Sequence, residues 1–336
     1  MMQQVNIHGP GKVELDESKE PEPGPRDAVV RVAACGVCGT DVRYVRMGGL
    51  CRPMPLGHEL SGVIESVGAE VSDLTPGTRV VLNPTASGNM IGNGGSEGGF
   101  TQQLLVRNAA DGGSLFPIPD DLPMHLAALS EPLGVGMNAV NRADVNPGDK
   151  VAVFGAGPIG LSAIATLRDR GVEDVVAIDL SPRRLELAAA LGARATIRAD
   201  EQNPWVELKK LHGEAPLMGA PMAGTDAYIE ASGAGSVITD VLQNAKAESS
   251  LTVVALHEQP VNVSFLWVMM KQMTIRGAME YPADYTDAVE LLTRWDLSPM
   301  ITHRFPLERI ADAIEVATDP NAGGKVMIDI DKGVGQ

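Results

Sequence analysis

The sequence predicts an α/β fold in two domains: a mostly-β domain followed by a doubly wound parallel sheet. The length of 336 residues suits two domains of about 100–200 residues each. The first third reads as short strands separated by turns, whereas from Val151 onward short apolar runs alternate with helical stretches. Such alternation is typical of βαβ units in a parallel sheet.

The strands expected in the first third are apolar runs that end at glycine or at Asn-Pro. They cover residues 29–34, 62–67 and 79–82. Residues 85–99 are rich in Gly, Ser and Asn, so we expect an irregular loop there. A helical pattern then runs from about Ala127 to Asn141 and leads into the second domain.

The parallel-sheet region is expected to contain four recognisable strands and two helices between them. The strands are residues 151–154, 175–178, 227–229 and 251–254, and the helices are residues 159–170 and 182–191. After Gly277 the pattern loosens into helices near 284–295 and 307–318 and a last strand, 325–330. We place this tail back on the first domain, which gives a first domain of residues 1–137, a parallel-sheet domain of 138–277 and a returning segment of 278–336.

Composition excludes several classes of function. The net charge of −16 disfavours nucleic acid and anionic membranes as partners. No secretory signal opens the chain, and no run of about 18 apolar residues occurs. Three cysteines are too few for a disulfide framework, so a cytoplasmic location is expected.

A glycine loop follows the strand 151–154. Gly155, Gly157 and Gly160 fit the pattern G-x-G-x-x-G, with Pro158 and Ile159 between the last two. The loop directly follows an apolar strand and opens a helix, as dinucleotide binding requires. The first glycine allows the tight turn, the second lets the backbone approach a pyrophosphate, and the third allows close packing.

The choice of dinucleotide depends on the end of the next strand. Asp179 stands 19 residues after Gly160, where a carboxylate accepts hydrogen bonds from a ribose 2′-hydroxyl and repels a 2′-phosphate. NAD is therefore expected rather than NADP. Arg184 is expected to pack beside the adenine, although it could instead bind a 2′-phosphate or be a solvated helix charge.

Cysteine, histidine and glutamate residues form a candidate metal site in the first domain. Cys35 and Cys38 form a C-x-x-C pair, which alone is either a redox pair or half of a zinc site. His58 and Glu59 follow 20 residues after Cys38, beside predicted strands. Thiolate, imidazole and carboxylate are zinc ligands, and three protein ligands leave a fourth position open. Glu131, at the start of the helix leading to the second domain, is the candidate third ligand.

These residues belong to a longer pattern. Gly57-His58-Glu59, Gly62, Gly68 and Val71 have the spacing G-H-E-x2-G-x5-G-x2-V, and the chain closes on Gly323-Gly324-Lys325-Val326. The chain resembles the zinc alcohol dehydrogenases of the medium-chain dehydrogenase/reductase superfamily over essentially its whole length. The resemblance implies a GroES-like catalytic domain and a Rossmann domain.

The resemblance also assigns the metal ligands. It implies that Cys38, His58 and Glu131 hold a catalytic zinc, with Glu59 beside the metal or alternating as a ligand. Glutamate followed by Pro-Leu at the third position is similar to sorbitol and butanediol dehydrogenases. Cys35 and Cys51 are interpreted as structural, and His8, His125, His212, His257 and His303 as surface or packing residues.

The chain departs from its relatives in two places. Many relatives carry a structural zinc on a four-cysteine lobe at the position of residues 84–99, where this chain has no cysteine. One catalytic zinc and no structural zinc are therefore expected. Relatives often have a relay histidine five residues after the zinc cysteine, and here that residue is Arg43, which stays protonated and cannot simply pass a proton on.

Together these features predict hydride transfer between an alcohol, secondary or polyol-like, and NAD, giving a ketone or aldehyde. Zinc would polarise the substrate oxygen, and Thr40 would pass its proton outward, in a cleft between the domains. The alternatives are a zinc-free quinone or enoyl reductase of the same superfamily and a non-catalytic NAD-binding redox sensor. The substrate stays open, and relatives imply a homodimer or homotetramer.

Overall fold

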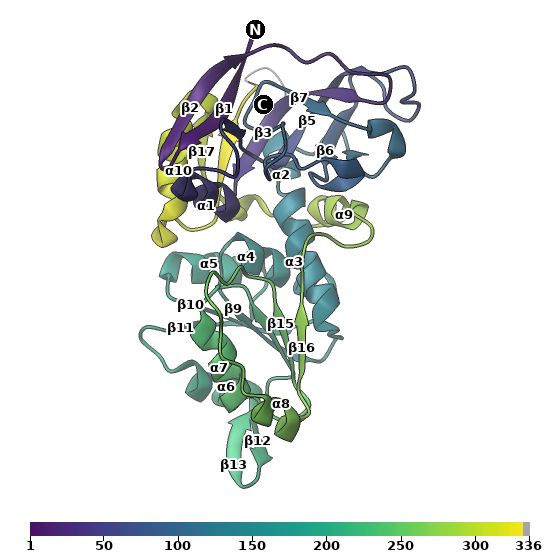
Figure 1. Ribbon diagram of the computed structural model, residues 1–336. Helices are drawn as coiled ribbons and strands as arrows, with labels where there is room; N and C mark the ends of the chain where they lie inside the picture. Colours follow the sequence, from purple (N-terminus) through teal and green to yellow (C-terminus); the bar gives the residue numbers. More distant parts are fainter. Residues whose placement is uncertain (332–336) are drawn as a thin grey trace. The chain divides into compact units, whose positions relative to one another are not determined.

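The computed structural model describes residues 1–331, which fold into two compact units (Figure 1). The first unit contains residues 1–131 and the described residues from Tyr285 onward, and the second is Pro132–Asp284. The sequence predicted that the chain passes from the first domain to the second after residue 137 and returns after residue 277. The first crossing lies inside a continuous helix, where no turn residue marks the change of packing partners, so the sequence carries no local signal for it.

The first unit is built on a seven-stranded sheet with the order β17-β18-β3-β5-β6-β8, in which β7 also pairs with β3. A three-stranded sheet, β2-β1-β4, lies in the same unit. The described strands are β1 (Met2–Gly9), β2 (Lys12–Ser18), β3 (Ala28–Val37), β4 (Met54–Pro55), β5 (Glu59–Val67), β6 (Arg79–Leu82), β7 (Gln103–Val106), β8 (Leu115–Pro117), β17 (Ile301–Pro306) and β18 (Lys325–Asp329).

Five α-helices lie wholly or partly in the described residues of the first unit. They are α1 (Gly39–Met47), α2 (Met124–Ala127), the start of α3 (Ser130–Ala143), α9 (Thr286–Arg294) and α10 (Ile310–Thr318). Short 3-10 turns occur at Ala86–Gly88, Ala109–Asp111, Ser298–Met300, Leu307–Arg309 and Pro320–Ala322. The helix expected at 127–141 corresponds to α3, which begins at Ser130 after the short helix α2, and the helix expected at 307–318 begins with a 3-10 turn.

Strand β18 brings the end of the chain back to the middle of the first sheet. It pairs antiparallel with β3, with Val326 opposite Val37 and Ile328 opposite Cys35. Both strands are almost entirely buried, because their apolar side chains share the core of the first unit. Lys325, the first residue of β18, therefore lies near the carboxyl end of β3.

The second unit is a six-stranded parallel sheet with the order β11-β10-β9-β14-β15-β16. Counted from β9, the strands lie in the order 3-2-1-4-5-6, so the strand order reverses between β9 and β14. Sheets of this kind bind ligands outside the carboxyl ends of the strands at this reversal. The strands are β9 (Lys150–Phe154), β10 (Asp174–Asp179), β11 (Ala195–Arg198), β14 (Ala227–Glu230), β15 (Ser250–Val253) and β16 (Thr274–Gly277).

Helices connect these strands, as the sequence alternation predicts. They are α4 (Pro158–Asp169), α5 (Pro182–Leu191), α6 (Pro204–His212), α7 (Gly235–Asn244) and α8 (Phe265–Lys271), and a hairpin of β12 (Glu214–Leu217) and β13 (Ala220–Ala223) follows α6. Ser181 and Asn203 cap α5 and α6 through their side-chain oxygens, each followed by proline at the first helical position.

Several elements were not foreseen: among them β1, β2, β11, α6, α7, α8 and β16. Strand β2 is polar and only partly buried, and α8 exposes half of its apolar side chains, so neither has the buried periodicity that predicts an element from sequence. Within residues 1–331, no helix is both long and apolar enough to cross a lipid bilayer.

Candidate active site

Cys38 follows β3 directly and caps the N-terminus of α1. Its backbone is extended, with φ −94° and ψ 154°, and its N–H donates to Oδ2 of Asp41 at 2.9 Å. The other carboxylate oxygen, Oδ1, accepts from the N–H of Gly57 at 3.1 Å. Through these two hydrogen bonds, the fully buried Asp41 connects the start of α1 to the turn before β5. Sequence reasoning missed Asp41, although its position three residues after a helix cap was a usable signal.

The turn at Gly57 aims the next two side chains inward. Gly57 has φ +90°, and a Cβ there would lie 2.8 Å from the backbone nitrogen of Phe100, so only glycine fits. His58 and Glu59 follow at 3% and 1% exposure. Glu59 stands opposite Gly36 in the β3–β5 pairing, and a Cβ at Gly36 would overlap its carboxylate. Gly36 therefore makes room for the Glu59 carboxylate, and Gly57 allows the turn to pack against Phe100.

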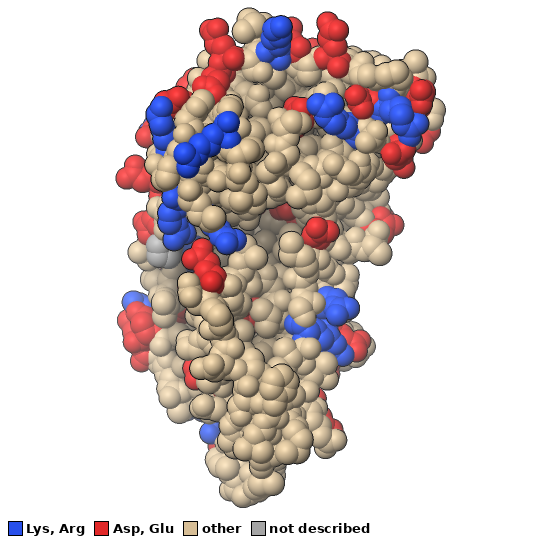
Figure 2. All heavy atoms as spheres, viewed as in Figure 1, with Lys and Arg blue, Asp and Glu red and all other residues tan. Residues whose placement is uncertain are grey.

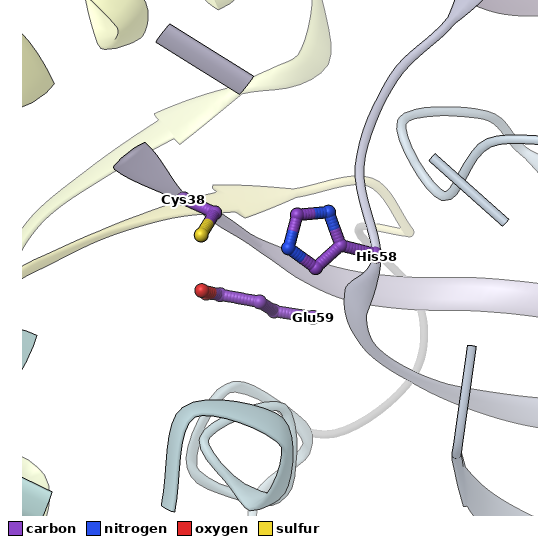
Figure 3. Close-up of side chains that lie close together, drawn as sticks. All are labelled: Cys38, His58 and Glu59. Carbon is purple, nitrogen blue, oxygen red and sulfur yellow. The ribbon is translucent and has the colours of Figure 1, made fainter. Parts of the chain in front are cut away.

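Cys38, His58 and Glu59 converge on one point (Figure 3). One possible ligand atom from each lies within 4.8 Å of the others. Nδ1 of His58 and Oε2 of Glu59 are buried and make no hydrogen bond within the described residues, although Nδ1 lies 3.7 Å from Oδ1 of Asp41. Buried polar atoms normally have partners, so Oε2 of Glu59 points to a ligand. Nδ1 of His58 faces Asp41, and the other ring nitrogen is the one turned toward Cys38 and Glu59 (Figure 3). A sulfur, an imidazole nitrogen and a carboxylate oxygen fit zinc.

The charges around His58 favour a cation. Burial alone would lower the pKa of His58, but the neighbouring Cys38, Asp41 and Glu131 outweigh it and raise that pKa well above its ordinary value. A site that stabilises an imidazolium in this way would equally stabilise a metal cation bound by the deprotonated ligands.

Glu131 lies near this group but outside it. It is 5% exposed, in the first turn of α3, and its charge contributes to raising the pKa values of both His58 and Lys325. Its carboxylate is not among the three ligand groups within 4.8 Å of one another, where Glu59 stands instead. The structure thus places both candidate glutamates at the site and brings Glu59 closer.

Lys325 is a further residue of the site that sequence reasoning missed. Its Nζ lies 2.5 Å from Oε1 of Glu59 and donates to the carbonyl of Val37 at 3.1 Å, with both side chains buried. Burial opposes the charge of Lys325, but Glu59 and the other anionic groups raise its pKa. A lysine that opens an otherwise apolar strand was the available signal.

The other residues that the sequence singled out in the first unit lie on α1, in β3 and in the loop after α1. Thr40 is half-buried as the second residue of α1, and Arg43 lies one turn further along the same helix. Cys35 is fully buried, which raises the pKa of its thiol well above the ordinary value, and Cys51 is exposed. Neither belongs to the group of three.

The glycine loop in the second unit has the geometry that its sequence predicts. Gly155 has φ +94°, and a Cβ there would lie 2.6 Å from the backbone nitrogen of Ser232. A Cβ at Gly160 would overlap the carbonyl of Gly155. Gly157 caps α4, Pro158 occupies its first turn, and a Cβ at Gly157 would have nothing nearer than Nη1 of Arg184 at 3.9 Å. That open side at a helix N-terminus suits a pyrophosphate.

Asp179 ends β10 beside this loop. Its Oδ2 accepts from the N–H of Ala156 at 2.7 Å, and its Oδ1 accepts from the N–H of Ser181 at 2.8 Å. The carboxylate therefore holds the glycine loop against the start of α5, a role that the sequence alone did not reveal. Ser181 in turn accepts from the N–H of Arg184 at 3.4 Å, and Ile159 lies in the first turn of α4.

Comparisons with known proteins identify the family of the chain. A family model described as an alcohol dehydrogenase GroES-like domain matches residues 24–120, and one described as a zinc-binding dehydrogenase matches residues 158–294. Sorbitol dehydrogenase of Homo sapiens is 31% identical over 345 residues, covering 97% of this chain and 95% of that protein.

Solved structures share the fold. The 2R,3R-butanediol dehydrogenase of Bacillus subtilis superposes with a TM-score of 0.87 at 24% identity, covering 98% of this chain and 100% of the other. A protein described as a zinc-binding dehydrogenase from Sinorhizobium meliloti 1021, solved with NADP bound, gives 0.85 at 26% identity, covering 98% and 99%. The predicted fold class and the predicted resemblance are confirmed.

Proposed function

Because this chain belongs to the zinc-dependent alcohol and polyol dehydrogenases of the medium-chain dehydrogenase/reductase superfamily, we propose that it oxidises a secondary alcohol or polyol with NAD, using one zinc ion per chain. Membership makes it an oxidoreductase that uses zinc and a nicotinamide cofactor on small-molecule alcohols. The ligands, the number of zinc ions, the choice of NAD and the type of alcohol are the proposed parts.

The observation that carries the proposal is the buried group of Cys38, His58 and Glu59, with ligand atoms within 4.8 Å of one another. We assign Cys38 and His58 as zinc ligands and leave the carboxylate ligand to Glu131 or Glu59. Lys325 engages Oε1 of Glu59 and leaves Oε2 without a partner among the described residues, so the structure does not choose between the two glutamates. The absence of cysteine between residues 84 and 99 supports a single zinc.

When bound, zinc supplies Lewis acidity and the nicotinamide accepts the hydride. The protein's part is positioning and proton transfer. Asp41 holds the backbone of Cys38 and Gly57, so that both ligand-bearing segments keep their places. Thr40, on α1 two residues after Cys38, is assigned as the hydroxyl that takes the substrate proton toward solvent. Arg43 stands at the position of the relay histidine in relatives and cannot complete the relay in the same way.

Recognition of NAD is assigned to the glycine loop and to Asp179. Gly155, Gly157 and Gly160, with Pro158 and Ile159, form the loop that would receive the pyrophosphate. The Asp179 carboxylate favours ribose hydroxyls over a 2′-phosphate. Arg184 is assigned to the adenine side, as its position five residues after Asp179 predicts. The Sinorhizobium relative was solved with NADP, so both cofactors have to be compared for this chain.

The substrate class is proposed from the relatives. Sorbitol and butanediol dehydrogenases are named for a polyol and a diol, and the Glu131-Pro-Leu sequence of this chain resembles theirs. We therefore propose a vicinal diol or polyol oxidised at a secondary carbon. A panel of polyols, diols, cyclic alcohols and simple primary alcohols, assayed with NAD and with NADP, tests this proposal.

The two rival functions are separated by metal content and turnover. A zinc-free quinone or enoyl reductase would contain no zinc and would reduce its substrate without an alcohol. A redox sensor would bind NAD but would not produce NADH with any alcohol. Metal analysis together with the alcohol panel distinguishes these outcomes, and protein free of zinc or inactive throughout the panel would overturn the proposed function.

A homodimer is proposed from the exposed apolar side chains of α8 and β16. Phe265, Leu266 and Met269 are 76%, 59% and 65% exposed, and β16, with Ile275, is the last strand of its sheet. Figure 2 shows a largely uncharged surface over the part of the second unit that carries α8. Two copies joined edge to edge at β16 would cover this surface. Light scattering of the parent and of Phe265→Glu tests it, and a monomeric parent would contradict it.

A further inference from the structure

Glu230 is a fully buried carboxylate at the carboxyl end of β14. In the parallel sheet it stands opposite Phe154, the last residue of β9, and opposite Val253 of β15. It therefore lies at the point where the strand order changes direction, next to the residue that precedes the glycine loop. No role was assigned to it from the sequence.

Its two oxygens join two loops. Oε1 accepts from the N–H of Ser232 at 2.8 Å, from the hydroxyl of Ser232 at 2.5 Å and from the N–H of Gly233 at 2.9 Å, all in the loop after β14. Oε2 lies 2.8 Å from Nε2 of His257, in the loop after β15. The sequence predicts a surface or packing residue at His257, and the structure shows that its imidazole lies against a buried carboxylate.

The glycine loop packs directly against this arrangement. The N–H of Ala231 donates to the carbonyl of Phe154 at 2.7 Å, and the Cα of Gly155 is so close that a Cβ there would lie 2.6 Å from the nitrogen of Ser232. Glu230 thus connects the loops after β14 and β15, and the loop after β14 packs in turn against the glycine loop that follows β9.

The strand order relates the loops after β14 and β15 to one half of a bound dinucleotide. Sheets of this strand order bind the two mononucleotide halves on either side of the switch point. Asp179 and β10 lie on one side of β9 and mark the adenosine half, so the nicotinamide half falls on the side of β14 and β15. The loops that Glu230 and His257 hold together are on that side.

We propose that the Glu230–His257 pair positions the nicotinamide half of the cofactor. Glu230 fixes the loops after β14 and β15, and its contact with Nε2 of His257 fixes the orientation of the imidazole ring. The other ring nitrogen, Nδ1, is thereby held in place to meet a hydroxyl of the nicotinamide ribose. This inference rests on the proposed function in one respect, namely that the second unit binds a nicotinamide dinucleotide.

The test compares two ligands on the same protein. AMP reports only on the adenosine half, whereas NADH also occupies the nicotinamide half. His257→Leu removes the hydrogen bond to Glu230, and His257→Gln keeps a side-chain N–H that can donate to it. Dissociation constants for NADH, from its fluorescence, and for AMP, from calorimetry, are measured for the parent and both variants of the full chain.

We expect His257→Leu to weaken NADH binding about tenfold, equivalent to about 1.4 kcal/mol, while AMP binding stays within about twofold of the parent. His257→Gln should recover most of the NADH affinity. His212→Gln is the matched control, because His212 is also a buried histidine of this unit, bonded to Thr225 at 2.8 Å, but it is the last residue of α6, before β14 begins. It should leave both constants unchanged.

Equal weakening of AMP and NADH by His257→Leu would mean that the pair only supports the fold, and would overturn the inference. Unchanged NADH binding would overturn it as well. If the leucine variant does not fold, His257→Asn, whose side chain is too short to reach Glu230, takes its place in the same comparison. A parent protein that binds neither ligand would contradict the proposed function instead, so the two failures are distinguishable.

Discussion

Nζ of Lys325 lies 2.5 Å from Oε1 of Glu59, although the two residues are 266 positions apart in the chain. Both side chains are buried, at 2% and 1% exposure. The ion pair joins β18 to the start of β5 beside the candidate zinc ligands, and it holds one oxygen of Glu59 while the other, Oε2, has no hydrogen-bond partner among the described residues. Lys325 therefore both compensates the charge of Glu59 and restrains it.

The first prediction concerns this ion pair. Lys325→Met leaves the Glu59 carboxylate buried without its cation, which typically costs about 3–5 kcal/mol of unfolding free energy. We expect that loss in zinc-free protein and a smaller one in zinc-loaded protein, because the metal would then compensate Glu59. Urea unfolding with and without a chelator measures both. Adding Glu59→Gln to Lys325→Met should recover part of the lost free energy of unfolding. A Lys325→Met protein with the same free energy of unfolding as the parent would contradict the prediction.

The second prediction concerns zinc. Metal analysis of the purified protein should give one zinc per chain, and Cys38→Ala or His58→Ala should lose that zinc and reduce turnover more than tenfold, while the dissociation constant for NADH stays nearly unchanged. Cys51→Ala is the matched control, since Cys51 is exposed and outside the group of three. Two zinc ions per chain would contradict the single site, and a Cys38 or His58 variant with a tenth or more of the activity would contradict the zinc mechanism.

The third prediction concerns Asp179. A charge-assisted hydrogen bond is worth about 1.5–3 kcal/mol, and repulsion of a 2′-phosphate adds to it, so the parent should prefer NAD over NADP by roughly a hundredfold in kcat/KM. Asp179→Ser should raise the use of NADP, because Arg183 and Arg184 then attract the phosphate. The same substitution should also weaken the binding of NAD, because Asp179 accepts from the N–H of Ala156 and so holds the glycine loop. Equal use of both cofactors by the parent would show that Arg184 dominates the choice.

The fourth prediction concerns acid stability. Burial lowers the pKa of His212 below its ordinary value of 6.5. As the pH falls through 6.5, the unfolded chain therefore binds a proton before the folded protein does, and the unfolding free energy decreases with a slope of at most about 1.4 kcal/mol per pH unit. Above that pH the contribution is fully present.

His212→Gln removes this titration. The difference in unfolding free energy between the parent and the variant should shrink as the pH is lowered from about 7.5 to about 5, although the parent stays more stable near neutral pH through its contact with Thr225. Denaturant unfolding at several pH values measures the difference. A difference that does not change with pH would mean that His212 does not titrate in this range.

The sequence by itself determined the features that depend on neighbouring residues. The glycine loop with Asp179, the Cys38 turn and the His58-Glu59 pair are recognisable because a strand end and the turn after it are local, and glycine is required there by backbone geometry. For the same reason the alternation of strands and helices was readable in the second unit.

Only the tertiary structure decided which distant groups meet these residues. The pairing of β18 with β3 brings Lys325 to Glu59, Asp41 reaches across to Gly57, and β14 and β15 align so that Glu230 meets His257. These contacts depend on strand register and on long-range packing, which sum over the whole core rather than over a motif. A buried charge needs a partner, but only the folded chain identifies which one it finds.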